Sequence, residues 1–262
     1  MLIDLPSLAV LCFIGSHLLF GLPPLRTHLI SVLSEQRFVA VFSLTAALSL
    51  SLLAWALYAS LRQEVPNPWL LMLPGARIGL GIVAWLGLSL ALAALPGYPK
   101  TPMALFQTRV HTPFGISKIS RHSFFVGFAV FALAHSVLMS ERAAALMMLG
   151  FAVLSLLGAS IQDRKLLMRH GEAYRPFMQA TSVLPFLAIL QGRTRIQAED
   201  RIVATLLKSA LAAALITLMH PLWQLANGAA LPVLLAIGGF YLSARRWLAA
   251  RRRDTAGQVH RA

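Results

Sequence analysis

The chain has 262 residues, of which 58% are hydrophobic and only 12% are charged, and its mean hydropathy is +0.71. An ordinary soluble domain carries about 25% charged residues, so this composition excludes a soluble globular enzyme and a disordered chain. Several apolar runs are long enough to cross about 30 Å of hydrocarbon as helices of about 20 residues. The sequence therefore predicts an all-α fold, a polytopic membrane helix bundle.

Seven apolar runs are the expected membrane spans. In chain order they cover residues 5–24, 38–60, 78–95, 122–140, 143–161, 203–223 and 228–244. Most of the 23 Lys and Arg residues follow the first, third, fifth and seventh runs, and basic loops are normally the cytoplasmic ones. This distribution predicts about seven transmembrane helices, with the N-terminus outside (N-out) and the C-terminus inside (C-in).

The two ends of the chain indicate where the protein is located. The chain begins MLID, with the acidic Asp4 and no basic residue before the first run, so we expect a retained helix and not a cleaved signal peptide. The single cysteine, Cys12, lies inside this run, which excludes a disulfide within one chain. The net charge of +14 includes a basic tail, 245–262, expected to anchor the topology at an anionic leaflet and not to bind nucleic acid. A bacterial inner (cytoplasmic) membrane is the expected location, with the lipid bilayer as the main partner.

We expect a single transmembrane domain over residues 1–244, with two long cytoplasmic loops at 96–121 and 162–202. The second loop ends in the apolar stretch TSVLPFLAIL. About ten residues are too few to span a bilayer, so this stretch is predicted to be interfacial or re-entrant. Gly75 and Gly79 form a small-xxx-small pair at the start of the third span, a common helix-packing pattern.

Histidines inside the predicted spans are candidate functional residues. His17 lies in the first span, His135 in the fourth and His220 at the end of the sixth, and His122 opens the fourth. Ionisable groups in hydrocarbon are costly and usually face the bundle interior, and imidazoles on facing helices often bind haem iron. The alternative for each histidine is a hydrogen bond between helices. At a helical rise of about 1.5 Å per residue, His135 and His220 are the two histidines whose predicted depths in the membrane are most similar. The differences between the pairs are as small as the error of the span edges.

Four segments resemble the NnrU family of bacterial membrane proteins and its relative, the ζ-carotene cis-trans isomerase of plants and cyanobacteria. They are HLLFGLPPLRTHLISVLSEQRFVAVFSL, ISRHSFFVGFAVFALAH, DRKLLMRHGEAYRPFMQATSVLPFLAILQGR and MHPLWQ. The resemblance implies haem b held by paired histidines, with His17 and His135 as the iron ligands. The depth argument leaves His220 as the alternative ligand. The implied role is either redox or cis-trans isomerase-like. An isomerase would act on an apolar polyene, whereas a role linked to nitrogen-oxide reduction would involve a small nitrogen-oxide ligand.

Further residues receive roles within this haem hypothesis. Arg121 and Arg26 are expected to pair with the haem propionates as bidentate partners. His122 is expected either to orient the iron ligands without touching the iron, or to replace His17 as a ligand. Asp163 and Arg164 are expected to close the cytoplasmic side of the pocket, unless each belongs only to an exposed ion pair at a helix end.

The sequence departs from the family pattern at two positions. Ser123 stands where these families usually have proline after Arg-His, and Ala132 stands where the isomerase has a cysteine three residues before the second histidine. A mechanism that needs this thiol as an alternative iron ligand therefore cannot operate in this chain.

Two other classes of protein compete with the haem hypothesis. The set Arg121, His122, Gly127, Gly171, Tyr174, Phe177, Ser182 and Pro185 also resembles the S-adenosylmethionine-dependent membrane methyltransferases of the isoprenylcysteine and phospholipid type. Free N–H groups at a helix start beside an arginine can hold a carboxylate, but methylation does not require His17 or His135. In the third class, a non-catalytic membrane subunit, both histidines are replaceable by leucine without loss beyond stability.

Overall fold

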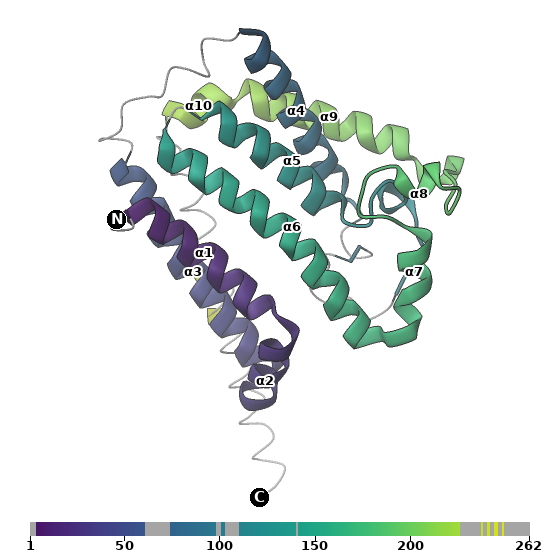
Figure 1. Ribbon diagram of the computed structural model, residues 1–262, viewed down its shortest axis with the longest axis horizontal. Coiled ribbons are helices and arrows are strands. Elements are labelled where there is room, and N and C mark those ends of the chain that lie inside the picture. The colour runs from purple at the N-terminus through teal and green to yellow at the C-terminus, as the bar shows by residue number, and fades with distance from the viewer. Residues whose placement is uncertain are drawn as a thin grey trace, which may run out of the picture. The chain divides into compact units, whose positions relative to one another are not determined.

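The computed structural model describes residues 4–60, 74–97, 101–102, 110–139 and 141–225, with six isolated positions after 236. The regular elements in these ranges are all helical, as expected (Figure 1). They form two compact units, one holding α1 to α3 and the other extending from α4 to Pro221. Most of the predicted span 228–244, most of the tail 245–262 and part of the loop 96–121 lie outside the described residues.

The first unit begins with a helix that proline breaks. Helix α1 (Leu5–Gly21) starts at Asp4, whose carboxylate accepts a hydrogen bond from the Ser7 backbone N–H at 2.9 Å. Pro23 follows at the start of α2 (Pro23–Leu33), where a missing N–H is tolerated but where α1 cannot continue. The two helices are bent by 75°. The predicted run 5–24 is thus occupied by α1 up to Gly21, and its last residues belong to the differently directed α2.

Helix α3 (Glu35–Ser60) packs against both α1 and α2. Small residues are among the most buried residues of these helices, and small residues let two backbones approach closely. Ala9 of α1 and Ala40, Ala47 and Ala56 of α3 are at most 1% exposed. At 26 residues, α3 is long enough to cross a bilayer.

The second unit is a row of four long helices. Helix α5 (Ser123–Leu138) lies between α4 (Pro74–Ala93) and α6 (Arg142–His170), and α9 (Ile202–Leu218) packs on α4 (Figure 1). This order brings the start of α5 beside the later turns of α6. Those turns carry the polar residues discussed below.

Helices α4 and α5 touch through two glycines. A methyl group placed on Gly127 would lie 2.6 Å from the carbonyl oxygen of Gly87, and one on Gly87 would lie 2.8 Å from the carbonyl oxygen of Gly127. Both positions therefore need the absence of a side chain. Gly75 and Gly79, the pair expected to mark helix packing, have no neighbouring atom within 4 Å of such a methyl group among the described residues.

The described residues contain four or five candidate membrane spans, and most of the seventh expected run, 228–244, lies outside them. Four segments of the described chain are long and apolar enough to cross a membrane: Glu35–Ala59, Gly75–Ala93, Arg142–Ala180 and Ala198–Leu218. The bent pair α1 and α2 makes five if it counts as one span. Helix α5 is apolar but has only 16 residues, fewer than a straight span usually needs. The described part of the chain thus has the helices of a membrane protein, with four or five candidate spans.

Short elements connect the long helices where a cytoplasmic loop was predicted from residue 162. Helix α6 instead continues to His170 and ends at Gly171, which has a positive φ of 55° that glycine adopts readily. The short elements, in chain order, are η3 (Gly115–Lys118), η4 (Gly171–Tyr174), α7 (Arg175–Ala180), α8 (Leu187–Leu190) and η5 (Ala198–Asp200), and α10 (His220–Leu225) follows α9. Within the apolar stretch 181–190, only the last four residues are helical.

Candidate functional site

The Arg-His pair lies at the start of α5, on a loop that two backbone hydrogen bonds hold in place. The Arg121 N–H donates to the Ser182 carbonyl at 2.8 Å, and the Phe186 N–H donates to the Ile119 carbonyl at 2.9 Å. These bonds fasten the segment before α5 to the segment after α7. Residues far apart in the sequence thereby surround Arg121 and His122.

Asp163 of α6 is the centre of a buried polar cluster. One carboxylate oxygen accepts hydrogen bonds from His122 Nε2 at 2.8 Å and from the Tyr174 hydroxyl at 2.8 Å. The other accepts from Arg121 Nε at 2.9 Å. A buried carboxylate is tolerated only when it is paired and hydrogen-bonded, and Asp163 meets both conditions.

The partners of Arg121 lie within the protein itself. Besides Asp163, its guanidinium donates from NH1 to the carbonyl oxygens of Met178 at 3.2 Å and Thr181 at 3.4 Å. Arg121 therefore links the start of α5 to α6 and to the end of α7. Its expected pairing with a haem propionate stays a prediction.

The alternative of an exposed ion pair at the end of α6 is wrong for Asp163. Its side chain is buried and pairs with Arg121, which comes from a different part of the chain, while the neighbouring Arg164 is exposed. The helix continues beyond both residues, so they do not mark its end.

His122 is fully buried and one of its two ring nitrogens has no partner. Nε2 faces the Asp163 carboxylate, which only accepts, so the hydrogen lies on Nε2 and Nδ1 keeps a lone pair. Among the described residues, nothing forms a hydrogen bond with Nδ1. Asp163 thus occupies Nε2, and Nδ1 is the ring nitrogen without a partner.

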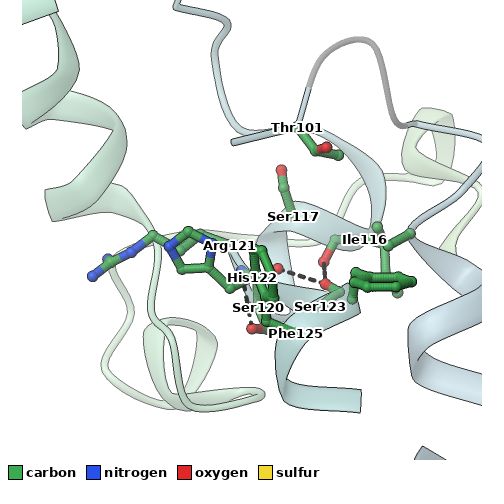
Figure 2. Close-up of a pocket in the computed structure, with 10 residues that line it drawn as sticks. Thr101, Ile116, Ser117, Ser120, Arg121, His122, Ser123 and Phe125 are labelled. Carbon is green, nitrogen blue, oxygen red and sulfur yellow. Dashed lines mark hydrogen bonds between the residues drawn. The ribbon is translucent and has the colours of Figure 1, made fainter. Parts of the chain in front are cut away.

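A small pocket lies beside this cluster (Figure 2). Its lining includes Thr101 and the serines at 117, 120 and 123, together with Arg121 and His122. In Figure 2 the side chains of Arg121 and His122 extend to one side, away from Thr101 and Ser117. The cavity volume is about 10 Å³, roughly what one water molecule needs. The pocket fits a single water and not a large cofactor.

A second buried ion pair, which the sequence did not reveal, holds the neighbouring loop. Lys118 Nζ lies 2.6 Å from Asp200 Oδ2, with both side chains less than 10% exposed. Asp200 also accepts from the backbone N–H groups of Gly115 and Gln197. The only sequence signal for this ion pair is that the chain has just 9 acidic residues. An acidic residue near an apolar segment of such a chain is expected to pair with a basic residue.

His135 sits at the opposite end of α5, among rings. Its ring centroid is 4.9 Å from that of Phe131 and 5.8 Å from that of His220. Its Nδ1 is buried and has no hydrogen-bond partner within the described residues. The ring of His220 is thus a direct neighbour of the His135 ring, while the depth of both in a membrane stays a prediction.

His17 lies in the first unit, among aromatic residues of α1 and α3. Its ring centroid is 4.2 Å from that of Phe13 and 5.3 Å from that of Phe42. His17 Nδ1 donates to the Phe13 carbonyl oxygen at 2.8 Å. Because a carbonyl only accepts, Nδ1 carries the hydrogen and Nε2 keeps a lone pair, which is the usual state of a histidine that binds a metal.

Arg26 belongs to the same unit as His17. Its guanidinium carbon lies 5.3 Å from the ring centroid of Phe38, and its NH2 is 3.9 Å from a carboxylate oxygen of the half-exposed Glu35. Arg121, His122, His135 and His220 all belong to the second unit. The pairing of His17 with His135 across the units stays a prediction.

The residues present are compatible with haem. Haem iron needs an imidazole nitrogen with a free lone pair on each side. His17 Nε2 has one, because Nδ1 holds the hydrogen, and the buried Nδ1 of His135 has no competing hydrogen bond among the described residues. Asp163 occupies Nε2 of His122, while its buried Nδ1, like that of His135, has no hydrogen-bond partner among the described residues.

The fold and these histidine environments define an all-helical membrane protein with imidazoles in its apolar helices. The NnrU protein family model matches residues 7–228, and the chain therefore belongs to the NnrU family.

Two curated relatives are 15-cis-ζ-carotene isomerases of the chloroplast. The maize protein (Zea mays) is 39% identical over 82 residues, which cover 31% of this chain and 22% of the relative. The Arabidopsis thaliana protein is 39% identical over 94 residues, which cover 36% and 24%. The chain thus matches less than a quarter of the length of these relatives. No solved structure matches the chain.

Proposed function

We propose that this protein is an integral membrane protein with a cis-trans isomerase-like role on an apolar polyene, and that it binds haem b through His17 and His135. The observation that carries the proposal is the 39% identity to two proteins named 15-cis-ζ-carotene isomerase. A polyene is as apolar as a lipid tail, so a protein of apolar helices can receive it from the bilayer.

The roles of the residues follow from their surroundings. The Phe13 carbonyl orients the His17 ring and keeps Nε2 free for a metal. Phe131 packs on His135 and restricts its ring. Bound haem would supply an iron that can change oxidation state. The chain supplies the two imidazoles and excludes water through the surrounding aromatic residues.

The buried cluster at Asp163 has a positioning role in this proposal. It fixes the start of α5 against α6 through Arg121 and His122. Because α5 is a continuous helix from Ser123 to Leu138, fixing its start also restricts where His135 lies. His122 is therefore a supporting residue in this proposal and not an iron ligand.

The topology and location stay predictions. The distribution of basic residues favours N-out and C-in, and a bacterial inner membrane remains the expected location. The curated relatives are chloroplast proteins, so a related membrane of another compartment is the alternative.

The proposal is tested by the absorption spectrum of the full-length protein, purified in detergent after expression with added haem precursor. We expect a Soret band that sharpens on dithionite reduction and that His135→Leu abolishes. His28→Gln, at an exposed position of α2, is the matched control and should leave the spectrum unchanged. A colourless wild-type protein would overturn haem binding, and S-adenosylmethionine binding in that protein would favour the methyltransferase class.

The isomerase role needs a separate assay. Purified protein in liposomes is incubated with 15-cis-ζ-carotene, and the isomers are separated by chromatography. We expect faster conversion than in liposomes that contain the His135→Leu protein. Equal conversion in both samples would contradict the isomerase role while leaving haem binding intact.

A further inference from the structure

Two histidines from distant parts of the chain meet in the second unit. His135 is in the last turn of α5 and His220 opens α10, and their ring centroids are 5.8 Å apart with the ring planes at 73°. Neither residue is held there by an acidic partner among the described ion pairs. Two imidazole rings therefore lie side by side, with the His135 ring partly buried and the His220 ring exposed.

The buried Nδ1 of His135 needs an explanation. Buried polar atoms are nearly always hydrogen-bonded, and an exception often marks a bound water, an ion or a functional site. Among the described residues this nitrogen has no hydrogen-bond partner. The ring also packs on Phe131 at 4.9 Å, which limits its freedom to turn toward another partner.

The spacing of the two rings fits a shared metal centre. Metal–nitrogen bonds are about 2.0–2.1 Å long, so two imidazoles on one ion place their centroids about 5–6.5 Å apart, depending on the angle between the bonds. The observed 5.8 Å lies within this range. An edge-to-face contact between two rings without a metal would give similar spacing, and the experiments below separate the two cases.

We propose that His135 and His220 form a two-imidazole site for one transition-metal centre, with His220 able to replace His17 as the second ligand. Imidazole nitrogen favours borderline metals such as Zn, Cu, Co and Fe. Two sources supply this chemistry, haem iron and a free divalent ion. The haem source rests on the proposed function, whereas the free-ion source does not.

The free-ion source is tested on the full-length protein expressed without added haem precursor and stripped with a chelator. Co²⁺ is titrated in, and its visible absorption bands report the ligands. We expect binding in the wild type and at least ten-fold weaker binding in both His135→Gln and His220→Gln. His28→Gln is the control, and circular dichroism checks that each variant is folded. Equal Co²⁺ affinity in the wild type and in both variants would overturn the free-ion source.

The haem source is tested by spectra of the reconstituted protein in two variants. We expect His17→Leu to keep a six-coordinate bis-imidazole spectrum, and the double variant His17→Leu/His220→Leu to lose it. Loss of the six-coordinate spectrum in His17→Leu alone would overturn the replacement by His220 while the proposed function stands. Conversely, a protein that binds no haem but binds Co²⁺ through His135 and His220 would refute the proposed function and support the pair.

Discussion

His122 and Asp163 form a buried contact in which the imidazole Nε2 lies 2.8 Å from a carboxylate oxygen. The contact joins the first residue before α5 to the polar part of α6. Tyr174 donates to the same carboxylate oxygen, and Arg121 donates to the other one. One acidic side chain thus fixes a helix start, a second helix and the turn after it.

Replacement of Asp163 by asparagine should destabilise the protein strongly. The variant Asp163→Asn keeps the shape but leaves Arg121, whose side chain is 12% exposed, without its negative partner. Breaking a buried ion pair in this way costs about 3–5 kcal/mol. The measurement is the free energy of unfolding in mixed micelles.

The control is another acidic residue with an arginine partner. Glu172 pairs with Arg175 at 2.8 Å, but the two side chains are 83% and 61% exposed. Exposed pairs contribute little, so Glu172→Gln should leave the unfolding free energy almost unchanged. An equal loss in both variants would show that the burial of Asp163 is not the cause.

Replacement of His122 should affect stability and not the iron. His122→Asn removes the ring that contacts Asp163, and its loss should lower the unfolding free energy by about 1–3 kcal/mol. If haem is bound, the Soret band per haem should stay unchanged, because the proposed function gives His122 a supporting role and assigns the iron to His17 and His135. A spectrum altered as strongly as in His135→Leu would instead make His122 an iron ligand.

Part of the fold follows from the sequence. Apolar run lengths predicted the helical class and the approximate positions of α3, α4 and α9, because hydrophobicity is a local property. The extension of α6 to His170 was not predicted, because its last turns are polar and the apolar run ends at residue 161. The bend at Pro23 was also missed, although proline is a visible signal for a helix break.

The polar cluster was only partly predictable. Arg121 and His122 were singled out through the family resemblance and because His122 is an ionisable residue at the start of an apolar run, and Asp163 because it follows such a run closely. Their mutual contact spans more than 40 positions in the sequence, and no local pattern encodes it. Lys118 with Asp200 and the glycine contact at Gly127 depend on the same kind of distant packing.

Addition of a methyl group at the crossing of α4 and α5 should be costly. Gly127→Ala would place a carbon 2.6 Å from the Gly87 carbonyl oxygen, so the two helices must move apart. Overpacking of this kind costs about 1–3 kcal/mol. Gly75→Ala is the matched control, because no described atom lies within 4 Å of the added carbon. The measurement is the midpoint of thermal unfolding of both variants. Equal midpoints would contradict the close contact between α4 and α5.

Loss of the Lys118–Asp200 pair should loosen one region and leave the rest of the protein intact. The Asp200 carboxylate accepts from Lys118 Nζ at 2.6 Å and from the backbone N–H groups of Gly115 and Gln197 at 2.9 and 2.8 Å. Asp200→Asn removes the negative charge that all three donors face. We expect amide hydrogen exchange at residues 115–118 and 197–201 to become at least ten-fold faster, equivalent to about 1.4 kcal/mol of local stability.

The same experiment contains its own internal reference. Exchange along α5 should change little, because the Asp163 cluster holds the start of that helix independently of Asp200. Glu199→Gln, at the exposed neighbouring position, should leave both regions unchanged. Faster exchange along α5 in Asp200→Asn would mean that the two buried ion pairs act as one unit. Unchanged exchange at 115–118 would mean that Lys118 does not need Asp200 to hold the loop.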